Sequence, residues 1–420
     1  MTLSLDQLHN LVAGDAVAIR GTATLEPAGG PGDKIFPPTH AVDDKDRSKA
    51  GAKYALETRR IGGQDVTCVL IDSVQSQANR MEEALESLWV DNQIALPVVS
   101  VDFSSVAPEV GRVSSLTAPH RIADALLRDS LLDGELFRLS KLGKSFSDAS
   151  TRNATALFKV CPTGLVFGLW DSTGPKGGLG AKFQRVLVSE IVGINVDIGS
   201  KTESRIDPVT NGKTDLDLYK PSSRDEMWTL DPAQALTENG QPVKVGKKEK
   251  AGKPSAVVLG NIAPSIDSVS GGVTIDEAKH TVVLSLASLR RLGFTVGAKE
   301  ARTVLAALGL LAVFAAESRG HDLRSRCLLV PRVADRDGSP QSLCLKLESI
   351  ARDGTTTPVE LDLEGAIALY DEAVKALPPE LHFDRPAGEP IAVLTPSPKL
   401  AELVRNSREL AVAEADIGDD

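Results

Sequence analysis

The stretch LVFGLWDSTGPKGGLGAKFQRVLVSEIVG, residues 165–193, decides how the rest of the chain is interpreted. Its first six residues are apolar and aromatic, as in a buried strand. The next ten residues include four glycines and a proline, and from Ala181 onward apolar residues recur at helical spacing. The stretch therefore predicts a strand, a glycine-rich turn and a helix.

This predicted turn has the features of an anion-binding site. The first amides of a helix lack internal partners and the helix dipole is positive there, so a bound phosphate is favoured. Lys176, Lys182 and Arg185 add positive charge at the same end. The spacing fits neither GxxxxGK[ST] nor GxGxxG, which argues against a nucleotide site. A flexible turn with solvated lysines is the alternative that the sequence leaves open.

The composition describes a protein of ordinary hydrophobicity and negative charge. Of the 420 residues, 42% are hydrophobic and 25% charged, which is typical of a globular protein. A net charge of -10 argues against a protein that coats nucleic acid by bulk charge, but a local basic groove is compatible with it. With no evident signal peptide and no apolar run of about 20 residues, we expect a cytoplasmic protein that does not enter membranes.

The cysteine spacing and the order of predicted strands and helices limit the possible fold. Four cysteines lie far apart without a CxxC pair, so we expect neither a zinc site nor another cofactor. Strands and helices alternate irregularly, which favours an α+β fold over a doubly wound sheet. We predict one domain over residues 1–355, with long loops at about 27–53 and 197–253, and a helical extension with an acidic tail at 356–420. Residues 304–316 are predicted to form a core helix.

Polar residues on two predicted helices are candidates for a functional site. The helix DSVQSQANRMEEALESLW, capped by Asp72 or Ser73, places Gln75 and Asn79 near one face with Arg80 beside it. Amides and an arginine near a strand end suit a ribose or phosphate, although Asn79 bonded to a neighbouring loop explains the pattern equally well.

A second helix is predicted to open at Pro119, with His120 and Arg121 in its first turn. Histidine is the usual proton carrier near neutral pH, but no nucleophile motif such as GxSxG accompanies it. A histidine bonded to a loop carbonyl is the alternative. We therefore expect no catalytic residue here.

The densest arginine series lies in the last third of the chain: Arg290, Arg291, Arg302, Arg319, Arg324 and Arg326. In the predicted strand DLRSRCLL, Arg324 and Arg326 are expected to share one face. Such a row makes a platform for phosphates or bases, and pairing with acidic neighbours is the alternative. Asp171, Glu190 and Asp207 are candidates for a metal nuclease only because such enzymes use carboxylates.

Eight blocks occur in one order along the chain: DSVQSQANRMEEAL, APHRIADALLRDS, NATALFKVCPTGLVFGLWDSTGPKGGLGAKFQRVLVSEIVG, SRIDP, GNIAPS, LSLASLRRLGF, RTVLAALGL and DLRSRCLLVP. Together they resemble the backbone RAMP subunit of subtype I-G (formerly I-U) CRISPR effector complexes. The resemblance runs from about residue 16 to residue 330.

The resemblance implies a modified RRM/ferredoxin-like RAMP palm with inserted finger and thumb segments. It also implies a non-enzymatic subunit whose copies stack as a filament along the spacer of a CRISPR RNA and present it to target DNA, next to a large subunit, a fused RNA-processing subunit and a recruited nuclease-helicase. A metal-dependent ribonuclease acting on target or guide RNA is the alternative. The RNA-binding residues we expect, with no catalytic or metal-binding residue, are Gln75, Asn79, Arg80, His120, Arg121, Lys176, Lys182, Arg185, Arg290, Arg291, Arg324 and Arg326.

Overall fold

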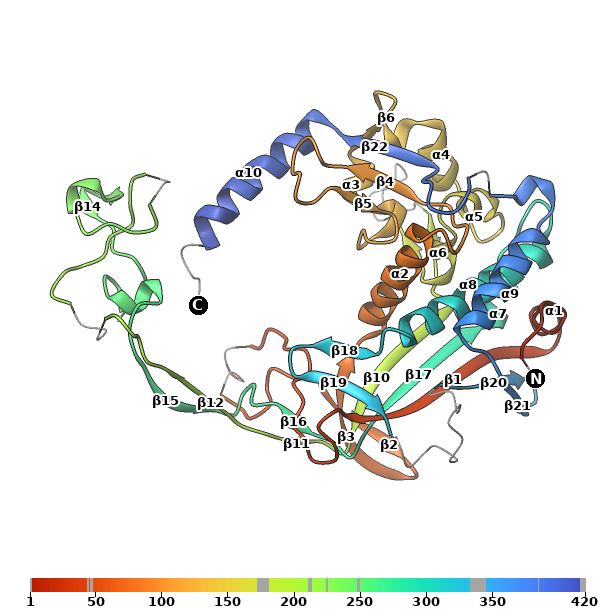
Figure 1. Cartoon of the computed structure of the whole chain (residues 1–420), viewed down its shortest axis with the longest axis horizontal. Coiled ribbons are helices and arrows are strands. Elements are labelled where there is room, and N and C mark those ends of the chain that lie inside the picture. The colour runs from red at the N-terminus through yellow and green to blue at the C-terminus, as the bar shows by residue number, and fades with distance from the viewer. Residues whose placement is uncertain are drawn as a thin grey trace.

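The computed structural model describes residues 2–43, 45, 48–171, 181–210, 214–223, 226–247, 250–332, 345–383 and 385–415, the last five without their side chains. It contains helices and mainly antiparallel strands, which confirms the α+β prediction (Figure 1). The α-helices are α1 Leu5–Ala13, α2 Val74–Val90, α3 Ala125–Arg128, α4 Lys141–Ser147, α5 Thr155–Val160, α6 Pro162–Val166, α7 Leu286–Leu289, α8 Ala298–Glu317, α9 Leu363–Lys375 and α10 Pro398–Ala415.

The strands are β1 Ala16–Pro27, β2 Leu56–Ile61, β3 Gln64–Asp72, β4 Val99–Asp102, β5 Arg112–Ser114, β6 Ser130–Leu132, β7 Glu135–Leu136, β8 Leu169–Trp170, β9 Lys182–Phe183, β10 Leu187–Ile194, β11 Asp197–Ile198, β12 Lys201–Arg205, β13 Thr237–Glu238, β14 Gln241–Pro242, β15 Ile262–Asp267, β16 Val273–Thr274, β17 Glu277–Ser285, β18 His321–Arg324, β19 Cys327–Pro331, β20 Lys346–Ala351, β21 Thr356–Val359 and β22 Ala392–Pro396.

The main sheet is antiparallel and is built around β1. Its order is β18-β19-β1-β17-β10-β3-β2, and β20 also pairs with β1 and carries β21 at its other edge. Along β1, Ile19 and Leu25 are buried, whereas Arg20 and Thr22 on the other face are half-buried. This alternation is typical of an antiparallel sheet that packs one face against a core. Residues 16–25 alternate in polarity and residues 66–71 are mostly apolar, and the strands that these patterns predict are present as β1 and β3.

Helix α8 is the centre of the core. Fourteen of its twenty residues are buried, as expected for a helix that is apolar on all sides. Helices α1, α2, α6 and α9 pack on it, and α2, α8 and α9 lie on one side of the main sheet (Figure 1). The predicted core helix is thereby confirmed. Within the described residues no helix is long and apolar enough to cross a bilayer.

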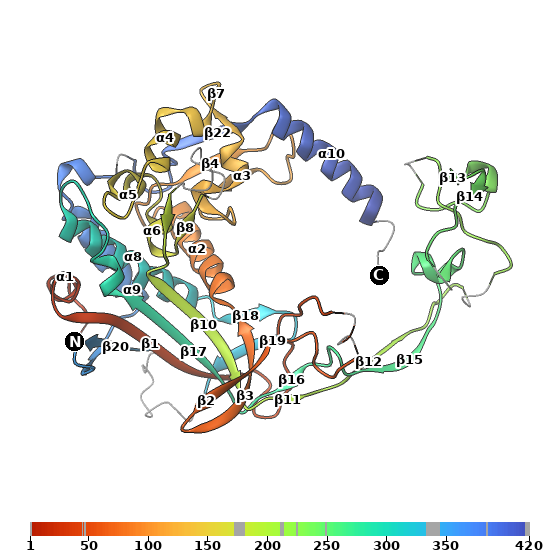
Figure 2. The same cartoon turned by 180° about the vertical axis from the view of Figure 1, so that it is seen from behind.

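A second, smaller sheet brings the C-terminal part of the chain against an early segment. Its order is β5-β4-β22-β6-β7, and β22 pairs parallel to β4 and antiparallel to β6. Seen from behind in Figure 2, α4, α5 and α6 lie beside this sheet, and α10 extends away from it.

An arm leaves the base of the main sheet between β10 and β17. Strands β11 and β16 begin it, β12 and β15 continue it as a two-stranded ribbon, and a small lobe with β13 and β14 ends it (Figures 1 and 2). Its apolar side chains include Ile206 and Val209, which are 86% and 89% exposed. The long loop predicted for residues 197–253 therefore contains short strands, which the sequence pattern missed because they bury almost nothing.

Residues 165–193 do not form the strand, turn and helix that we predicted. Residues 165 and 166 end helix α6, and only Leu169 and Trp170 are extended, in β8. The predicted helix after Ala181 is instead β9 and the long strand β10. The β-branched residues of β10 favour a strand, and pairing on both edges with β17 and β3 overrides their helical spacing. The glycine-rich turn, with Lys176, lies outside the described residues.

Two further local predictions are wrong. The segment after Pro119 forms a 3-10 turn at Arg121–Ala123, then α3 and β6, because Arg121 has φ 54° and interrupts helical geometry. Arg324 and Arg326 do not share a strand face. Arg324 ends β18, and Arg326 sits in the turn to β19 with φ 59°.

Candidate nucleic-acid interface

Two of the expected arginines meet at the buried carboxylate of Asp72, the last residue of β3. Asp72 Oδ2 accepts hydrogen bonds from Gln77 Nε2 at 2.7 Å and Arg80 Nε at 3.0 Å, and its Oδ1 accepts one from Arg324 Nη2 at 3.2 Å. Arg80 also donates to the Leu323 carbonyl and Arg324 to the Ile71 carbonyl. We call Asp72, Gln77, Arg80 and Arg324 the Asp72 cluster. It fastens β3, α2 and β18 together and leaves both guanidinium groups partly exposed.

The solvent side of α2 lies next to the Asp72 cluster. Ser73 caps the helix by accepting a hydrogen bond from the Ser76 amide, which confirms one of the two predicted caps. Gln75 and Asn79 are exposed one turn apart, and in the part of the chain that is described neither side chain is hydrogen-bonded. Arg319 donates to the Glu83 carbonyl further along the helix at 3.2 Å. Amides and arginines therefore border one side of α2.

The Arg121 side chain lies in the protein interior. Its side chain forms a two-pronged ion pair with Glu82 of α2, with both N···O distances 2.6 Å, and donates to the Gly168 carbonyl at 3.1 Å. The residue is 8% exposed, and its guanidinium also packs on the Phe167 ring. Burial raises the pKa of Glu82 to about 7, although Arg121 acts in the opposite direction. His120, directly before it, is exposed.

An exposed tryptophan lies at one border of the glycine-rich turn. Trp170 of β8 is 60% exposed, and Lys182 of β9, its partner in the strand pair, places Nζ 5.3 Å from the ring centroid. Arg185 is exposed three residues later. An open indole beside cations is suited to stacking a base and holding its phosphate. Our sequence prediction missed Trp170 because it assigned the residue to a buried strand.

Two cationic side chains lie near a second aromatic ring, that of Phe36. The Arg326 guanidinium lies 4.1 Å from the centroid of the half-buried Phe36 ring, and Lys34 Nζ lies 5.7 Å from it. The backbone supports this arrangement, since the Phe36 amide donates to the Arg326 carbonyl and Ile35 pairs with Val273. Phe36 and Lys34 were also missed, because residues 27–53 were predicted to be a mobile loop. We call Trp170–Lys182 and Phe36–Arg326 the two aromatic–cation pairs.

Arg290 and Arg291 belong to a different part of the molecule. Arg290 donates to the carbonyls of Leu11, Val12 and Ala16 and so satisfies the C-terminal end of α1. Ala16 begins β1, whereas β19 pairs with residues 25–27 of the same strand, and nine residues of strand span about 30 Å. Arg291 is exposed and donates to Ser288 Oγ. The predicted set is therefore divided between two ends of β1.

The three carboxylates considered for a nuclease are held by other groups. Asp171 accepts from Arg138 at 2.8 Å, and Glu190 pairs with Arg59 on the open face of the sheet. Asp207 in the arm accepts bonds from the amides of residues 209, 210 and 260, which hold its pKa well below the usual range. Among the described residues, the geometry does not gather these three into a metal-binding group.

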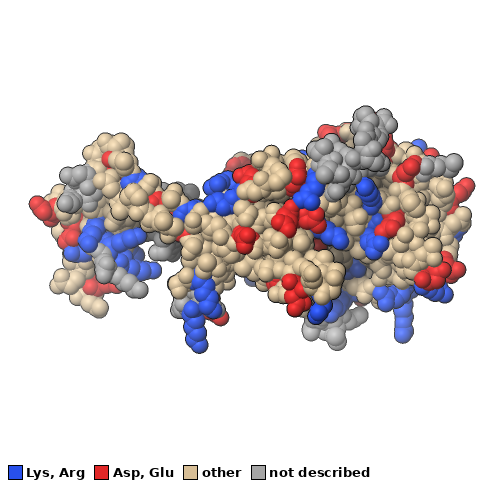
Figure 3. Space-filling model, turned by 90° about the horizontal axis from the view of Figure 1, so that it is seen from below, with Lys and Arg blue, Asp and Glu red and all other residues tan. Residues whose placement is uncertain are grey.

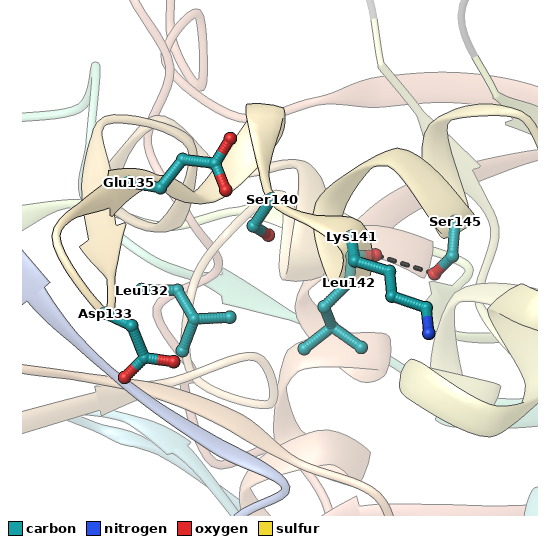
Figure 4. A pocket seen from close by; sticks show the side chains of 7 residues that line it. All are labelled: Leu132, Asp133, Glu135, Ser140, Lys141, Leu142 and Ser145. Atoms are coloured by element: carbon teal, nitrogen blue, oxygen red, sulfur yellow. Dashed lines mark hydrogen bonds between the residues drawn. The ribbon is translucent and has the colours of Figure 1, made fainter.

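A pocket of about 490 Å³ lies beside the second, smaller sheet, between the β6–β7 hairpin and α4 (Figure 4). It is lined by Leu132, Asp133, Glu135, Ser140, Lys141, Leu142 and Ser145. It shares no residue with the Asp72 cluster or the aromatic–cation pairs, and its acidic lining does not suit a polyanion. On the face seen in Figure 3, basic and acidic side chains are interspersed, so contacts with nucleic acid must be local.

Comparison with models of known protein families finds a match over part of the chain. Residues 19–198 match the model of a family described as CRISPR-associated protein GSU0053 (Cas_GSU0053). This range holds Phe36, Asp72, Arg121, Trp170 and Lys182. The match supports a CRISPR-associated protein, in agreement with the resemblance carried by the sequence blocks.

The other comparisons add little to this. No curated protein matches the chain. Among solved structures, the crystal structure of Thermofilum pendens Csc2 matches with 10% sequence identity over 98% of this chain and 92% of that one, at a TM-score of 0.29. A TM-score this low supports no conclusion about this chain.

Proposed function

We propose that this protein is a non-catalytic CRISPR RNA-binding backbone subunit of a type I effector complex. The observation that carries the proposal is the exposed Trp170 ring and the half-buried Phe36 ring, each with a cation beside it, in a chain whose residues 19–198 match a CRISPR-associated family. Bases stack on the rings, and Lys182, Arg185 and Arg326 hold phosphates. Such contacts accept any sequence, as a guide-binding subunit requires.

The finer assignment is an RRM/ferredoxin-like palm of subtype I-G. It is supported by the order β1, α2, β10, β17, α8 and β20, a βαββαβ pattern in one antiparallel sheet to which the hairpins β2–β3, before α2, and β18–β19, after α8, are added. In this proposal the arm is one of the inserted segments. Its exposed Ile206 and Val209 support contact with another macromolecule in the assembly.

Assembly follows from the same proposal. Copies of the chain stack along the spacer through two different faces, as a heterologous filament requires, and present the guide for pairing with target DNA. Its neighbours in the complex are a large subunit, a fused RNA-processing subunit and a recruited nuclease-helicase. The ribonuclease alternative lacks comparable support, because Asp171, Glu190 and Asp207 are bonded to other groups in different elements.

Filter binding of the purified protein to a single-stranded RNA of spacer length, over a range of salt concentrations, tests the proposal. With about four phosphate contacts per subunit, the logarithm of the association constant should fall against log salt with a slope of about -3. RNA that stays intact with magnesium supports a holding role. A flat salt response, or cleavage that EDTA abolishes, contradicts it.

A further inference from the structure

Two buried histidines and a glutamate meet where three elements of the main sheet and core join. His280 lies on β17, Glu317 ends α8 and His321 begins β18. His280 is 2% and His321 7% exposed, and one ligand atom from each of the three residues lies within 4.8 Å of the others. This cluster is separate from the aromatic–cation pairs and takes no part in the proposed RNA contacts.

The distances suit a small cation. His280 Nδ1 lies 3.2 Å from Glu317 Oε1, and His321 Nε2 lies 3.5 Å from Glu317 Oε2. Tetrahedral coordination with bonds of about 2.0–2.1 Å separates ligand atoms by about 3.3 Å. Small shifts of the side chains bring all three onto one ion.

A chain of hydrogen bonds fixes the tautomer of His280. Gln77 Nε2 donates to Asp72, so Gln77 Oε1 is the acceptor for the Ser189 hydroxyl at 2.9 Å. Because the one proton of Ser189 is used there, its oxygen accepts from His280 Nε2 at 2.8 Å. The proton of a neutral His280 therefore lies on Nε2, and the lone pair on Nδ1 faces Glu317. Orientation of a ligating histidine through its other nitrogen is the usual arrangement in metal sites.

The buried Nδ1 atom of His280 makes no hydrogen bond, although a carboxylate oxygen is near. A lone pair and an anionic oxygen repel each other at this distance. A cation between them removes the repulsion and gives Nδ1 a partner.

We propose that His280, Glu317 and His321 bind one divalent transition metal ion of the zinc class in a structural role. Two imidazoles and one carboxylate suit Zn²⁺ or Co²⁺, whereas Mg²⁺ and Ca²⁺ prefer oxygen ligands alone. The ion would join the end of α8 and the start of β18 to the centre of the sheet. Through Ser189 and Gln77 it would also support the Asp72 cluster. Cysteine spacing alone gives no sign of this site.

The test uses the full chain after removal of metal with a chelator. Titration with Zn²⁺ or Co²⁺ should give one bound ion per chain, and a hundredfold excess of Zn²⁺ over the dissociation constant should raise the melting temperature by on the order of 4 °C. Bound Co²⁺ should show the visible bands of a tetrahedral nitrogen and oxygen site without a thiolate charge-transfer band. Folded wild-type protein that binds no ion overturns the proposal.

Variants assign the ion to these side chains. Glu317→Gln and His321→Phe should lose stoichiometric binding, whereas His40→Gln, at an exposed histidine elsewhere, should keep it. Should the first two fail to fold, His321→Cys decides, because cysteine is also a zinc ligand. Retained binding with a new thiolate band in its Co²⁺ spectrum supports the site. An unchanged spectrum, or binding that persists in Glu317→Gln and His321→Phe, overturns it.

Discussion

The interior arginines along α2 and the cations on the aromatic rings carry the same formal charge in opposite surroundings. Arg121 is buried in an ion pair with Glu82, and Arg80 and Arg324 are bonded to Asp72. Lys182 and Arg326 instead lie over partly open rings. A guanidinium bonded to a buried carboxylate holds elements together, whereas a cation over an open ring is placed to meet a ligand.

This difference separates stability from binding. A buried ion pair is hard to break because the remaining charge is left without solvent or a partner. An exposed stacking ring contributes little to folding, since its area stays in water until a ligand covers it. Substitutions in the two regions should therefore move different observables.

The largest effect is expected at Arg121. Arg121→Ala leaves the buried carboxylate of Glu82 unpaired, so the free energy of unfolding should fall by about 3–5 kcal/mol. Urea denaturation followed by circular dichroism measures it. His120→Ala, at the exposed neighbour, is the matched control and should change it by less than about 0.5 kcal/mol. Equal effects of the two changes would place Arg121 on the surface, against the structure.

Trp170→Ala tests the other side of the comparison. Loss of the stacking ring should weaken RNA binding by about 1–3 kcal/mol, or roughly 5- to 150-fold, without lowering the free energy of unfolding. Trp170→Phe should retain most of the affinity, since a phenyl ring still stacks. Leu136→Ala, at another exposed apolar residue, should leave binding unchanged. Affinity that survives Trp170→Ala would remove the ring from the interface.

Lys182 and Arg185 should act through charge alone. Changing both to Ala removes two phosphate contacts, so the slope of log affinity against log salt should become shallower by about 1.4, using about 0.7 per contact. The loss should be similar for RNAs of any sequence. Lys141→Ala with Lys144→Ala removes the same charge from helix α4, and an equal change in slope there would show that only net charge matters.

How much the sequence predicts depends on how local the determinant is. Strands β1 and β3 and helices α2 and α8 follow from alternation, a serine cap and apolar content, all within one segment. The stretch at 165–193 was assigned wrongly because the pairing of β10 with β17 and β3 brings in residues far along the chain. Helical spacing within the segment could not reveal those partners.

The candidate site was likewise predictable only where its determinants are local. That arginines occur in this region is visible in the sequence, but Arg121 and Glu82 are 39 residues apart and Arg324 and Asp72 are 252 apart. Which arginines are held inside is thus decided by tertiary contacts. Phe36 and Trp170 were missed for a related reason, because their exposure depends on how the surrounding segments pack.

The smallest effect we expect is a pH dependence from Glu82. Its pKa is raised from 4.5 to about 7 in the fold, so between these values the folded state binds a proton that the unfolded state has released. Stability must then fall as pH rises through this window, and the change between pH 6 and pH 8 should be about 1 kcal/mol. Glu82→Gln should abolish this component in urea denaturation at the two pH values, whereas Glu83→Gln, at an exposed neighbour on the same helix, should retain it. If the free energy of unfolding still changed in this way in Glu82→Gln, Glu82 would not be the group that titrates. The ion pair between Glu82 and Arg121 would then stay charged between pH 6 and pH 8.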